Sequence, residues 1–437
     1  MGKKLFVVSL GCTKNLVDTE VMLGRLKDYS ITDRVEEAEV IIVNTCGFIE
    51  AAKQESIQTI FDLHSRRKRD SILVMAGCLS ERYKEELKQE LQEVDLFTGV
   101  GDYDRIDRLL AEKKDLFKEE TYLIDNEERI ITGSKHHAYI KISEGCNQRC
   151  SFCAIPSFKG RLKSRTVDSV IDEISRLSEE GFYDFTLISQ DTSSYLKDRG
   201  EREGLIRLIE RIDEKFPLKS GRILYLYPAT TDHKLIDTIR DSKSFHNYFE
   251  MPIQHISDKM LKIMKRGADA DRTKDLLYRM REIEDSFVRT GVIVGHPGES
   301  EKDFQELCDF LQGFGFDRIN VFAYSPEEGT ASYEMGETVE PKIVQERLEI
   351  MEKIAKESMY KSLNSEIGKK IEIFLEGQSE EGPYLLSARK SSWAPEIDSE
   401  ILINDSEIEN LETGKLYIAQ ITERVGDKLI GRILSNG

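Results

Sequence analysis

Three cysteines lie within eight consecutive positions of the chain: Cys146, Cys150 and Cys153, in the spacing C-x-x-x-C-x-x-C, with Phe152 directly before the last. We call these three the core trio. Three thiolates are one fewer than the four that close a structural zinc site or an ordinary iron–sulfur cluster. A cluster held by three thiolates leaves one iron with an open position, where a ligand can bind and react. The alternative is three buried structural thiols, but the polar residues at 147–149 are poor core residues and argue against it.

A second set of three cysteines follows a regular pattern near the start of the chain. Apolar, β-branched runs predict parallel strands at Leu5–Ser9, Val40–Asn44 and Ser71–Ala76. Amphipathic helices are predicted after them at Leu16–Asp28, Ala51–Arg69 and Glu81–Glu93. The cysteines that follow the three strands are Cys12, Cys46 and Cys78, which we call the N-terminal trio. Because parallel strands end at one edge of a sheet, the three thiols should converge there and hold a second cluster, unless they are unrelated buried thiols.

The strand–helix alternation restarts after a charged connector at Lys118–Lys135. The further strands predicted are Tyr139–Ser143, Phe185–Ser189, Ile223–Tyr227, Phe249–Gln254, Val292–Gly295 and Ile319–Tyr324. With the helical patterns between them, they predict a complete or partial (β/α)6 barrel whose function lies at the carboxyl ends of its strands. The core trio follows the first of these strands and therefore lies at that end. The other loops bring Ser189, Gln190, Gly295 and Pro297 to the same end.

The character of the chain changes after a long charged helix predicted at Lys342–Lys370. Short strands separated by turn residues are predicted at Lys370–Glu376, Tyr384–Ala388, Glu400–Ile403, Leu416–Ile421 and Lys428–Ile433, and they indicate a small β-barrel. Residues 371–437 hold 13 Asp or Glu and 6 Lys or Arg, a net charge of −7. The sequence therefore predicts an α/β protein with an N-terminal α/β domain at 1–135, a central partial barrel at 136–368 and an all-β barrel at 369–437.

The composition of the 437-residue chain is that of a globular protein with a sizeable core, at 39% hydrophobic residues and a formal net charge of −18. This acidity argues against a default nucleic-acid binder and favours a basic protein partner. No run reaches the 18 apolar residues of a membrane span, and the apolar stretch after Met1 is better explained as a strand than as a signal peptide. An odd count of 7 cysteines without the spacing of a secreted scaffold favours the reducing cytoplasm.

A few other residues could carry chemistry. Cys308 lies on an apolar helical face and is predicted to be a core thiol. The 7 histidines form no H-x-x-x-H pair, so a histidine metal site is not expected. Trp393 lies in a predicted turn and is either a core residue or a contact for a partner.

The core trio with Phe152 resembles the signature of radical S-adenosylmethionine (SAM) enzymes. Together with the N-terminal trio and the small barrel, which resembles a TRAM domain, it resembles the methylthiotransferase family over essentially the whole chain. The segments that carry this resemblance are Gly11-Cys12-x-Lys14-Asn15 with Asp18, Asn44-Thr45-Cys46, Gly77-Cys78, residues 145–156, Gly160-Arg161, Ser164-Arg165 and residues 295–299. His296 departs from the family pattern, which more usually has an aromatic residue there.

The resemblance implies two 4Fe–4S clusters, one on each trio, with SAM bound to the open iron of the core trio and Phe152 near its adenine. We expect further SAM contacts from Ser189, Gln190, Gly295 and Pro297. The family's chemistry is reductive cleavage of SAM to a radical that removes hydrogen from an unactivated carbon. The N-terminal trio would hold the sulfur to be inserted, and a second SAM would donate the methyl group.

Branches of this family differ in substrate: some modify tRNA adenosines, and one modifies the β-carbon of an aspartate in ribosomal protein S-12. Residues 224–228, Pro252-x-Gln254-His255 and residues 394–398 are similar to the S-12 branch. We therefore expect S-12 as substrate, docked by the acidic barrel with Trp393 and Glu396–Asp398. An electron donor such as a flavodoxin or ferredoxin is expected, with an unknown sulfur donor and no membrane.

Two other functions compete with this hypothesis. One is a tRNA adenosine methylthiotransferase on the same scaffold, but an acidic terminal barrel would repel a phosphate backbone. The other is a non-enzymatic iron–sulfur electron carrier, which does not need a chain of this size or a SAM-type barrel.

Overall fold

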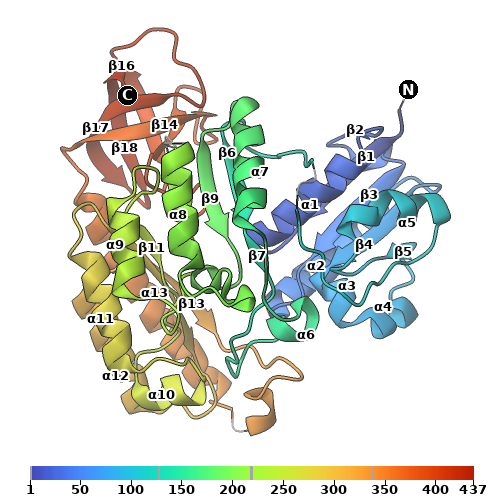
Figure 1. Ribbon diagram of the computed structural model, residues 1–437, viewed down its shortest axis with the longest axis horizontal. Helices are drawn as coiled ribbons and strands as arrows, with labels where there is room; N and C mark the ends of the chain where they lie inside the picture. The colour runs from blue at the N-terminus through green and yellow to red at the C-terminus, as the bar shows by residue number, and fades with distance from the viewer. Residues whose placement is uncertain (1, 126–127, 217–219, 337) are drawn as a thin grey trace.

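The computed structural model describes residues 2–125, 128–216, 220–336 and 338–437. Figure 1 shows three parts: an N-terminal α/β domain in blue, a central domain of helices over a parallel sheet in green to orange, and a terminal β-barrel in red. The three-part α/β architecture expected from the sequence is confirmed. Three hydrophobic clusters form the interiors: one in the central domain, one in the N-terminal domain, and one with residues from all three parts of the chain.

The N-terminal domain is a parallel sheet with the strand order β2-β1-β3-β4-β5. Its strands are β1 (Lys4–Ser9), β2 (Ser30–Ile31), β3 (Val40–Thr45), β4 (Ile72–Gly77) and β5 (Leu96–Phe97). Its helices are α1 (Thr13–Arg25), α2 (Glu50–Arg66), α3 (Cys78–Arg82), α4 (Lys84–Glu90) and α5 (Ile106–Glu112). The prediction of a single helix at Glu81–Glu93 was wrong. The backbone of Tyr83 is not helical (φ −125°, ψ 35°), and this residue separates α3 from α4.

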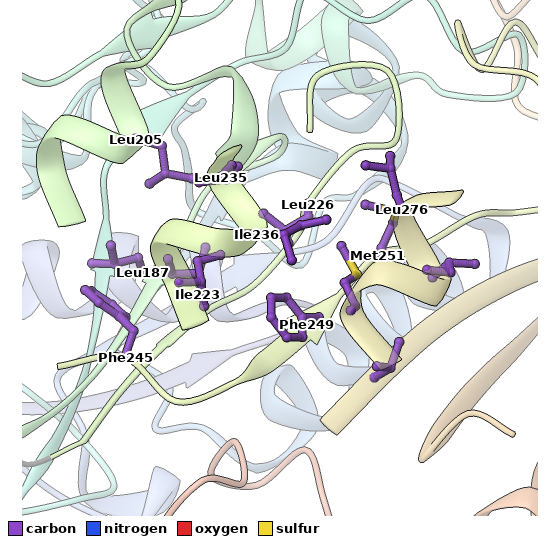
Figure 2. Close-up of a cluster of buried hydrophobic side chains, with 14 of the residues drawn as sticks. Leu187, Leu205, Ile223, Leu226, Leu235, Ile236, Phe245, Phe249, Met251 and Leu276 are labelled. Carbon is purple, nitrogen blue, oxygen red and sulfur yellow. The ribbon is translucent and has the colours of Figure 1, made fainter. Parts of the chain in front are cut away.

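The central domain is an open, six-stranded parallel sheet in the order β13-β12-β11-β10-β9-β6. Its strands are β6 (His137–Lys141), β9 (Asp184–Ile188), β10 (Ser220–Ile223), β11 (Tyr248–Glu250), β12 (Phe287–Val294) and β13 (Arg318–Ala323), with the small hairpin β7 (Ser143–Glu144) and β8 (Lys163–Ser164) beside them. Its helices are α6 (Ile155–Lys159), α7 (Val167–Glu179), α8 (Gly204–Lys215), α9 (His233–Asp241), α10 (Asp258–Ile263), α11 (Ala270–Arg281), α12 (Glu301–Phe314) and α13 (Pro341–Asn364). Short 3₁₀ helices lie at Val35–Glu37, Tyr103–Arg105, Thr192–Ser194, Lys197–Arg199 and Tyr333–Met335. Figure 2 shows the apolar side chains between sheet and helices, among them Leu187, Ile223 and Phe249 from the strands.

Two strands of this sheet are shorter than predicted. Strands were expected at Ile223–Tyr227 and Phe249–Gln254, but β10 ends at Ile223 and β11 at Glu250. The segments beyond these ends stay largely buried and contain Tyr225 and Gln254, which have positive φ of 64° and 68°. Such values are rare for residues other than glycine and concentrate at functional sites. The apolar pattern therefore predicted correctly that these segments are buried, but it did not predict that their backbone is no longer extended as a strand.

The terminal part closes into a barrel with the strand order β14-β15-β16-β18-β17. Its strands are β14 (Lys370–Gln378), β15 (Leu386–Lys390), β16 (Ile401–Ser406), β17 (Leu416–Val425) and β18 (Lys428–Asn436). The barrel joins the central domain through a buried junction. Asp184 of β9 pairs with Arg222 of β10 at 2.7 Å and with Arg389 of β15 at 2.6 Å.

The idea that Trp393 contacts a partner was wrong. Its side chain is only 3% exposed, and its ring lies 6.4 Å from that of Phe287, between the barrel and the central sheet. The Asp398 side chain is also buried, whereas Glu396 is exposed. The surface expected to dock S-12 through Trp393 and the Glu396–Asp398 turn is therefore largely an internal interface of this chain.

The charged connector is also more than a linker. Arg129 is buried and pairs with Glu20 of α1 and with Glu173 of α7, its Nε lying 2.8 Å from the Glu173 carboxylate. Burial alone would raise the pKa of Glu173, but Arg165 and Arg129 outweigh it and hold that pKa at about 2. The described part of the connector therefore ties the N-terminal domain to the central one.

Candidate active site

The core trio lies on the loop between β7 and α6, at the carboxyl end of the central sheet. Gly145 begins the loop with φ +76°, and a Cβ there would lie 2.3 Å from the carbonyl oxygen of Arg161, so only glycine fits. The loop is pinned by backbone hydrogen bonds from Cys146 to Gly160 (3.2 Å) and from Ser151 to Met264 (3.0 Å). These contacts hold the thiols without using their sulfur atoms.

Two sulfur atoms of the core trio, those of Cys146 and Cys150, have hydrogen-bond partners in their surroundings. The amide of Gln148 donates to Cys146 Sγ at 3.4 Å, and the Arg266 guanidinium donates to Cys150 Sγ at 3.1 Å. The Tyr227 hydroxyl lies 3.5 Å from Cys150 Sγ, and its ring packs under the guanidinium of Arg266 at 4.3 Å. Donors aimed at sulfur stabilise a thiolate, so this donor set fits metal ligation.

Burial shapes the protonation of the core thiols. It raises the pKa of both Cys146 and Cys153 to about 12, so the free side chains are neutral thiols at pH 7. A bound metal deprotonates the thiols that coordinate it. Neutral free thiols gathered on one short, glycine-initiated loop therefore fit a cluster that loads with loss of protons.

The N-terminal trio follows three adjacent strands of its sheet. Cys12 lies just before α1, Cys46 directly follows β3, and Cys78 begins α3 after β4. A Cβ on Gly11 would lie 2.8 Å from Cys46 Sγ, which shows how closely the first two loops approach. Burial raises the pKa of Cys46 to about 11, and the neighbouring Cys12 adds to this effect. Burial likewise raises the pKa of Cys78, and both other thiols of the trio contribute.

A buried charge cluster lies between the two trios. Lys141 of β6 pairs with Asp18 of α1 and, at 2.7 Å, with Glu144, two residues before Cys146. Lys159 of α6 pairs with the same two carboxylates at 3.2 and 3.4 Å. Burial opposes ionisation of Glu144, but the two lysines outweigh it and hold its pKa at about 2. This cluster joins α1 to the loop of the core trio and so fixes the position of one trio relative to the other.

The predicted SAM contacts occupy different surroundings. Gln190 donates its amide to Glu144, while its buried Oε1 has no hydrogen-bond partner among the described residues and is free to accept from a ligand. Ser189 is fully buried and donates to Thr192 Oγ1 at 3.2 Å. Gly295 donates its amide to Glu299 at 2.7 Å, and a Cβ there would lie 2.6 Å from Val344 of α13. The Pro297 carbonyl lies 2.8 Å from Nδ1 of His296.

His296 stands where the resemblance noted in the sequence led us to expect an aromatic residue. It is fully buried, its ring meets Phe152 edge-on at 6.3 Å and Tyr324 at 5.0 Å, and its Nε2 lies 2.7 Å from Ser332 Oγ. Burial lowers the pKa of His296, which keeps the ring neutral at pH 7. The neutral imidazole ring of His296 therefore packs against Phe152 much as an aromatic side chain would.

Two kinds of site are absent from the described residues. No group of three His, Cys, Asp or Glu side chains is arranged to hold a single metal ion; the thiolates of an iron–sulfur cluster need not meet at one ion, because they bind different irons. No helix in the described ranges is both long and apolar enough to cross a bilayer.

Comparison with known proteins identifies the family. Residues 4–99 match Uncharacterized protein family UPF0004, residues 140–311 the Radical SAM superfamily and residues 367–434 the TRAM domain. The chain is 63% identical over 433 residues, 99% of this chain and 100% of the relative, to "Ribosomal protein uS12 methylthiotransferase RimO" of Nitratiruptor sp.. A protein of the same name from Sulfurimonas denitrificans is 58% identical over 430 residues, covering 98% of both chains. The chain belongs to the RimO family.

Solved structures support the fold alone. The radical S-adenosylmethionine methyltransferase TsrM from Kitasatospora setae, with tryptophan and a SAM analogue bound, matches with a TM-score of 0.56 and 16% identity, over 74% of this chain and 73% of TsrM. Its cobalamin- and [4Fe-4S]-bound form matches with the same score over 76% and 77%.

Sequence reasoning missed several residues of this RimO-family site. Arg266 and Tyr227 contact Cys150, and Lys141 and Lys159 join the two trios, although none of the four carries a motif of its own. Tyr227 lies in the tyrosine-rich segment after β10, which the sequence predicted as the end of a strand and not as part of the site. Cys308, in contrast, lies on α12 in the main hydrophobic cluster, so the predicted core thiol is confirmed.

Proposed function

We propose that this chain is a radical SAM transferase that adds a methylthio group to the β-carbon of an aspartate in ribosomal protein S-12. It would use two 4Fe–4S clusters, one on each cysteine trio, and two molecules of SAM. The proposed division into domains is 1–135 for the sulfur-carrying cluster, 136–368 for SAM chemistry and 369–437 for the barrel. The family's names supply the substrate, and membership of the Radical SAM superfamily supports the use of SAM and an iron–sulfur cluster.

One observation carries this proposal. Each of two adjoining domains presents three cysteines at the carboxyl edge of a parallel sheet, and the buried cluster of Asp18, Lys141, Glu144 and Lys159 connects the two edges. A single redox site would need only one such trio. Two trios held in fixed relation suit a reaction that activates a carbon at one site and delivers sulfur from the other.

The chain's own residues would hold and isolate these groups. When bound, the cluster of the core trio and SAM supply a radical strong enough to take hydrogen from an unactivated carbon. Arg266 and the Gln148 amide stabilise negative charge on the core thiolates, and Gln190 offers an acceptor beside them. Phe152, packed against the neutral ring of His296, gives an apolar wall that keeps water from the reacting carbon.

Partners follow from charge and redox need. A net charge of −18 favours encounter with a basic ribosomal protein, and this attraction weakens as salt screens it. An external one-electron donor such as a flavodoxin or ferredoxin would reduce the core cluster. We expect the reaction in the cytoplasm, where ribosomal proteins are made and assembled.

The test incubates anaerobically reconstituted protein with SAM and a reductant, and with either S-12 or tRNA as acceptor. Mass spectrometry should find a methylthio group on one aspartate of S-12, and 5′-deoxyadenosine should form with it. Methylthio-adenosine in the tRNA, with S-12 unmodified, would instead establish the tRNA alternative.

Cysteine variants separate the two trios. Cys146→Ala should lose one cluster's iron and all 5′-deoxyadenosine formation. Cys12→Ala should lose the other cluster's iron and all methylthio transfer, while SAM cleavage stays detectable. Cys308→Ala is the matched control and should keep all its iron. Full iron content in Cys12→Ala would contradict the second cluster.

A further inference from the structure

Three lysines are buried among the described residues: Lys14, Lys141 and Lys159. Lys141 and Lys159 each pair with both Asp18 and Glu144. Lys14 is different, because no carboxylate oxygen of the described ranges lies within 4.0 Å of its Nζ, although its side chain is only 8% exposed. Buried charges in proteins are usually paired directly, so an ammonium that no carboxylate contacts suggests a role other than stability.

Lys14 is held in place by an aromatic ring. Its Nζ lies 3.2 Å from the ring centroid of Tyr225, a cation–π contact between α1 of one domain and the segment after β10 of the other. The backbone of Tyr225 is fixed on both sides: its amide donates to Glu250 at 3.2 Å, and its carbonyl accepts from Thr192 at 3.0 Å. The positive φ of 64° at Tyr225 is maintained by these bonds.

This contact lies between the two cysteine trios. Lys14 lies two residues after Cys12 in the chain, and Tyr225, on which it packs, adjoins Glu250. Glu250 is engaged elsewhere, since it accepts from the Tyr225 amide and lies 3.6 Å from Arg289. Two residues after Tyr225, the hydroxyl of Tyr227 reaches Cys150 of the core trio. Lys14 therefore stands beside a thiol of one trio and on a short segment that touches the other.

The loop that precedes Lys14 lies at the surface of the protein. Gly11 and Cys12 are exposed and Tyr225 is half-buried, so the loop before Lys14 faces solvent while Lys14 itself lies just beneath. An anion that enters beside Cys12 would meet an oriented ammonium that no carboxylate of the described residues contacts. The β-carbon of an aspartate is bonded directly to its carboxylate carbon, so capture of that carboxylate brings the β-carbon to the space between the trios.

We infer that Lys14, held on the ring of Tyr225, binds the side-chain carboxylate of the target aspartate and so selects an acidic residue for modification. This inference rests on the proposed function. Lys14 acts as a specificity residue for the acceptor, and Tyr225 positions it. The charge-assisted hydrogen bond would favour aspartate over asparagine by about 10- to 100-fold in affinity.

The test measures equilibrium binding without turnover. Labelled S-12 and a variant with asparagine at the modified position are titrated with reconstituted enzyme and SAM in the absence of reductant. The original chain should prefer the aspartate form by about 10- to 100-fold. Lys14→Met should remove that preference by weakening only the aspartate form, and Lys14→Arg should retain part of it.

A matched control is Lys88→Met. Lys88 also lies over an aromatic ring of the N-terminal domain, 4.7 Å from the centroid of Phe117, but it pairs with Asp115. This variant should keep the full preference. Iron content of each variant reports whether the cluster sites remain intact.

Each other outcome is decisive. An unchanged aspartate preference in Lys14→Met would overturn the inference, as would equal weakening of both forms, which would give Lys14 a structural role. Absence of preference in the original chain would also overturn it, while modification of S-12 could still stand. If the original chain neither binds nor modifies S-12, the proposed function itself fails.

Discussion

The junction of Asp184, Arg222 and Arg389 offers a quantitative test of how the barrel is attached. Asp184→Asn keeps the shape of the side chain but removes the negative charge between two buried guanidinium groups. Arg389 retains Glu376 at 2.9 Å, whereas Arg222 would be left with only uncharged acceptors, such as the Ser391 carbonyl at 2.6 Å. Removal of one partner of a buried ion pair costs about 3–5 kcal/mol, because the other charge stays buried.

This free energy converts to a measurable shift in thermal unfolding. An unfolding entropy of about 2.1 cal/mol/K per residue gives about 0.9 kcal/mol/K if the whole chain unfolds together, so Tm should fall by about 3–6 °C. Differential scanning calorimetry measures the shift. Asp275→Asn is the control, because Asp275 pairs only at the surface, where such pairs contribute about 0–1 kcal/mol.

A second substitution makes the reasoning refutable. Arg222→Met in the Asp184→Asn background removes the unpaired charge and should recover part of the lost stability. If Asp184→Asn changes Tm no more than Asp275→Asn does, the buried pairs do not hold the barrel. If Arg222→Met lowers Tm further in the Asp184→Asn background instead of raising it, the stability lost in Asp184→Asn did not arise from an unpaired Arg222 charge.

Three further predictions follow from buried groups and close contacts. Burial lowers the pKa of His137 to about 3, so below about pH 6.5 the unfolded chain binds a proton that the folded chain does not, and the free energy of unfolding should fall by up to about 1.4 kcal/mol per pH unit. His137→Gln should reduce this pH dependence when the free energy of unfolding is measured with urea at pH 6 and pH 5. Gly295→Ala forces a Cβ against Val344 at φ +77° and should destabilise by about 1–3 kcal/mol, whereas Gly313→Ala, which meets no neighbouring atom, should not; equal urea midpoints would contradict the strain. Deletion of residues 369–437 should lower solubility and raise protease sensitivity of the remaining chain rather than only weaken substrate binding, and a compact, protease-resistant fragment would contradict this.

The elements and the cysteine sites could be predicted from local sequence patterns, whereas side-chain contacts between distant segments could not. The N-terminal trio could be placed because β1, β3 and β4 are adjacent parallel strands, so their carboxyl ends lie at one edge of the sheet. Arg266 could not be found, and Lys14 was noted only within a motif without its contact to Tyr225, because a lysine or arginine in a polar segment has no periodicity that reveals an unusual partner. The sequence could not decide whether Trp393 is a core residue or a contact for a partner, because a turn beside a barrel can face either solvent or another domain.

The backbone around the site shows a second limit. Tyr225 and Gln254 lie within apolar stretches typical of strands, yet both take positive φ. The hydrogen bonds that impose this conformation at Tyr225 come from distant residues, such as Thr192 and Glu250. Burial is encoded locally, whereas the direction of the chain at a functional loop is set by residues from several strand ends.

The Asp184 junction also bears on how the protein is made. Arg389 and the Ser391 carbonyl belong to the last part of the chain, yet they complete the ionic and hydrogen-bond environment of β9 and β10 in the middle of the central sheet. During synthesis, domains earlier in a chain generally fold as they emerge. Here Asp184 and Arg222 of the central sheet gain Arg389 and the Ser391 carbonyl only after β15 has left the ribosome. A chain that stops before β15 would therefore leave these buried charges with fewer partners and the central sheet with less support.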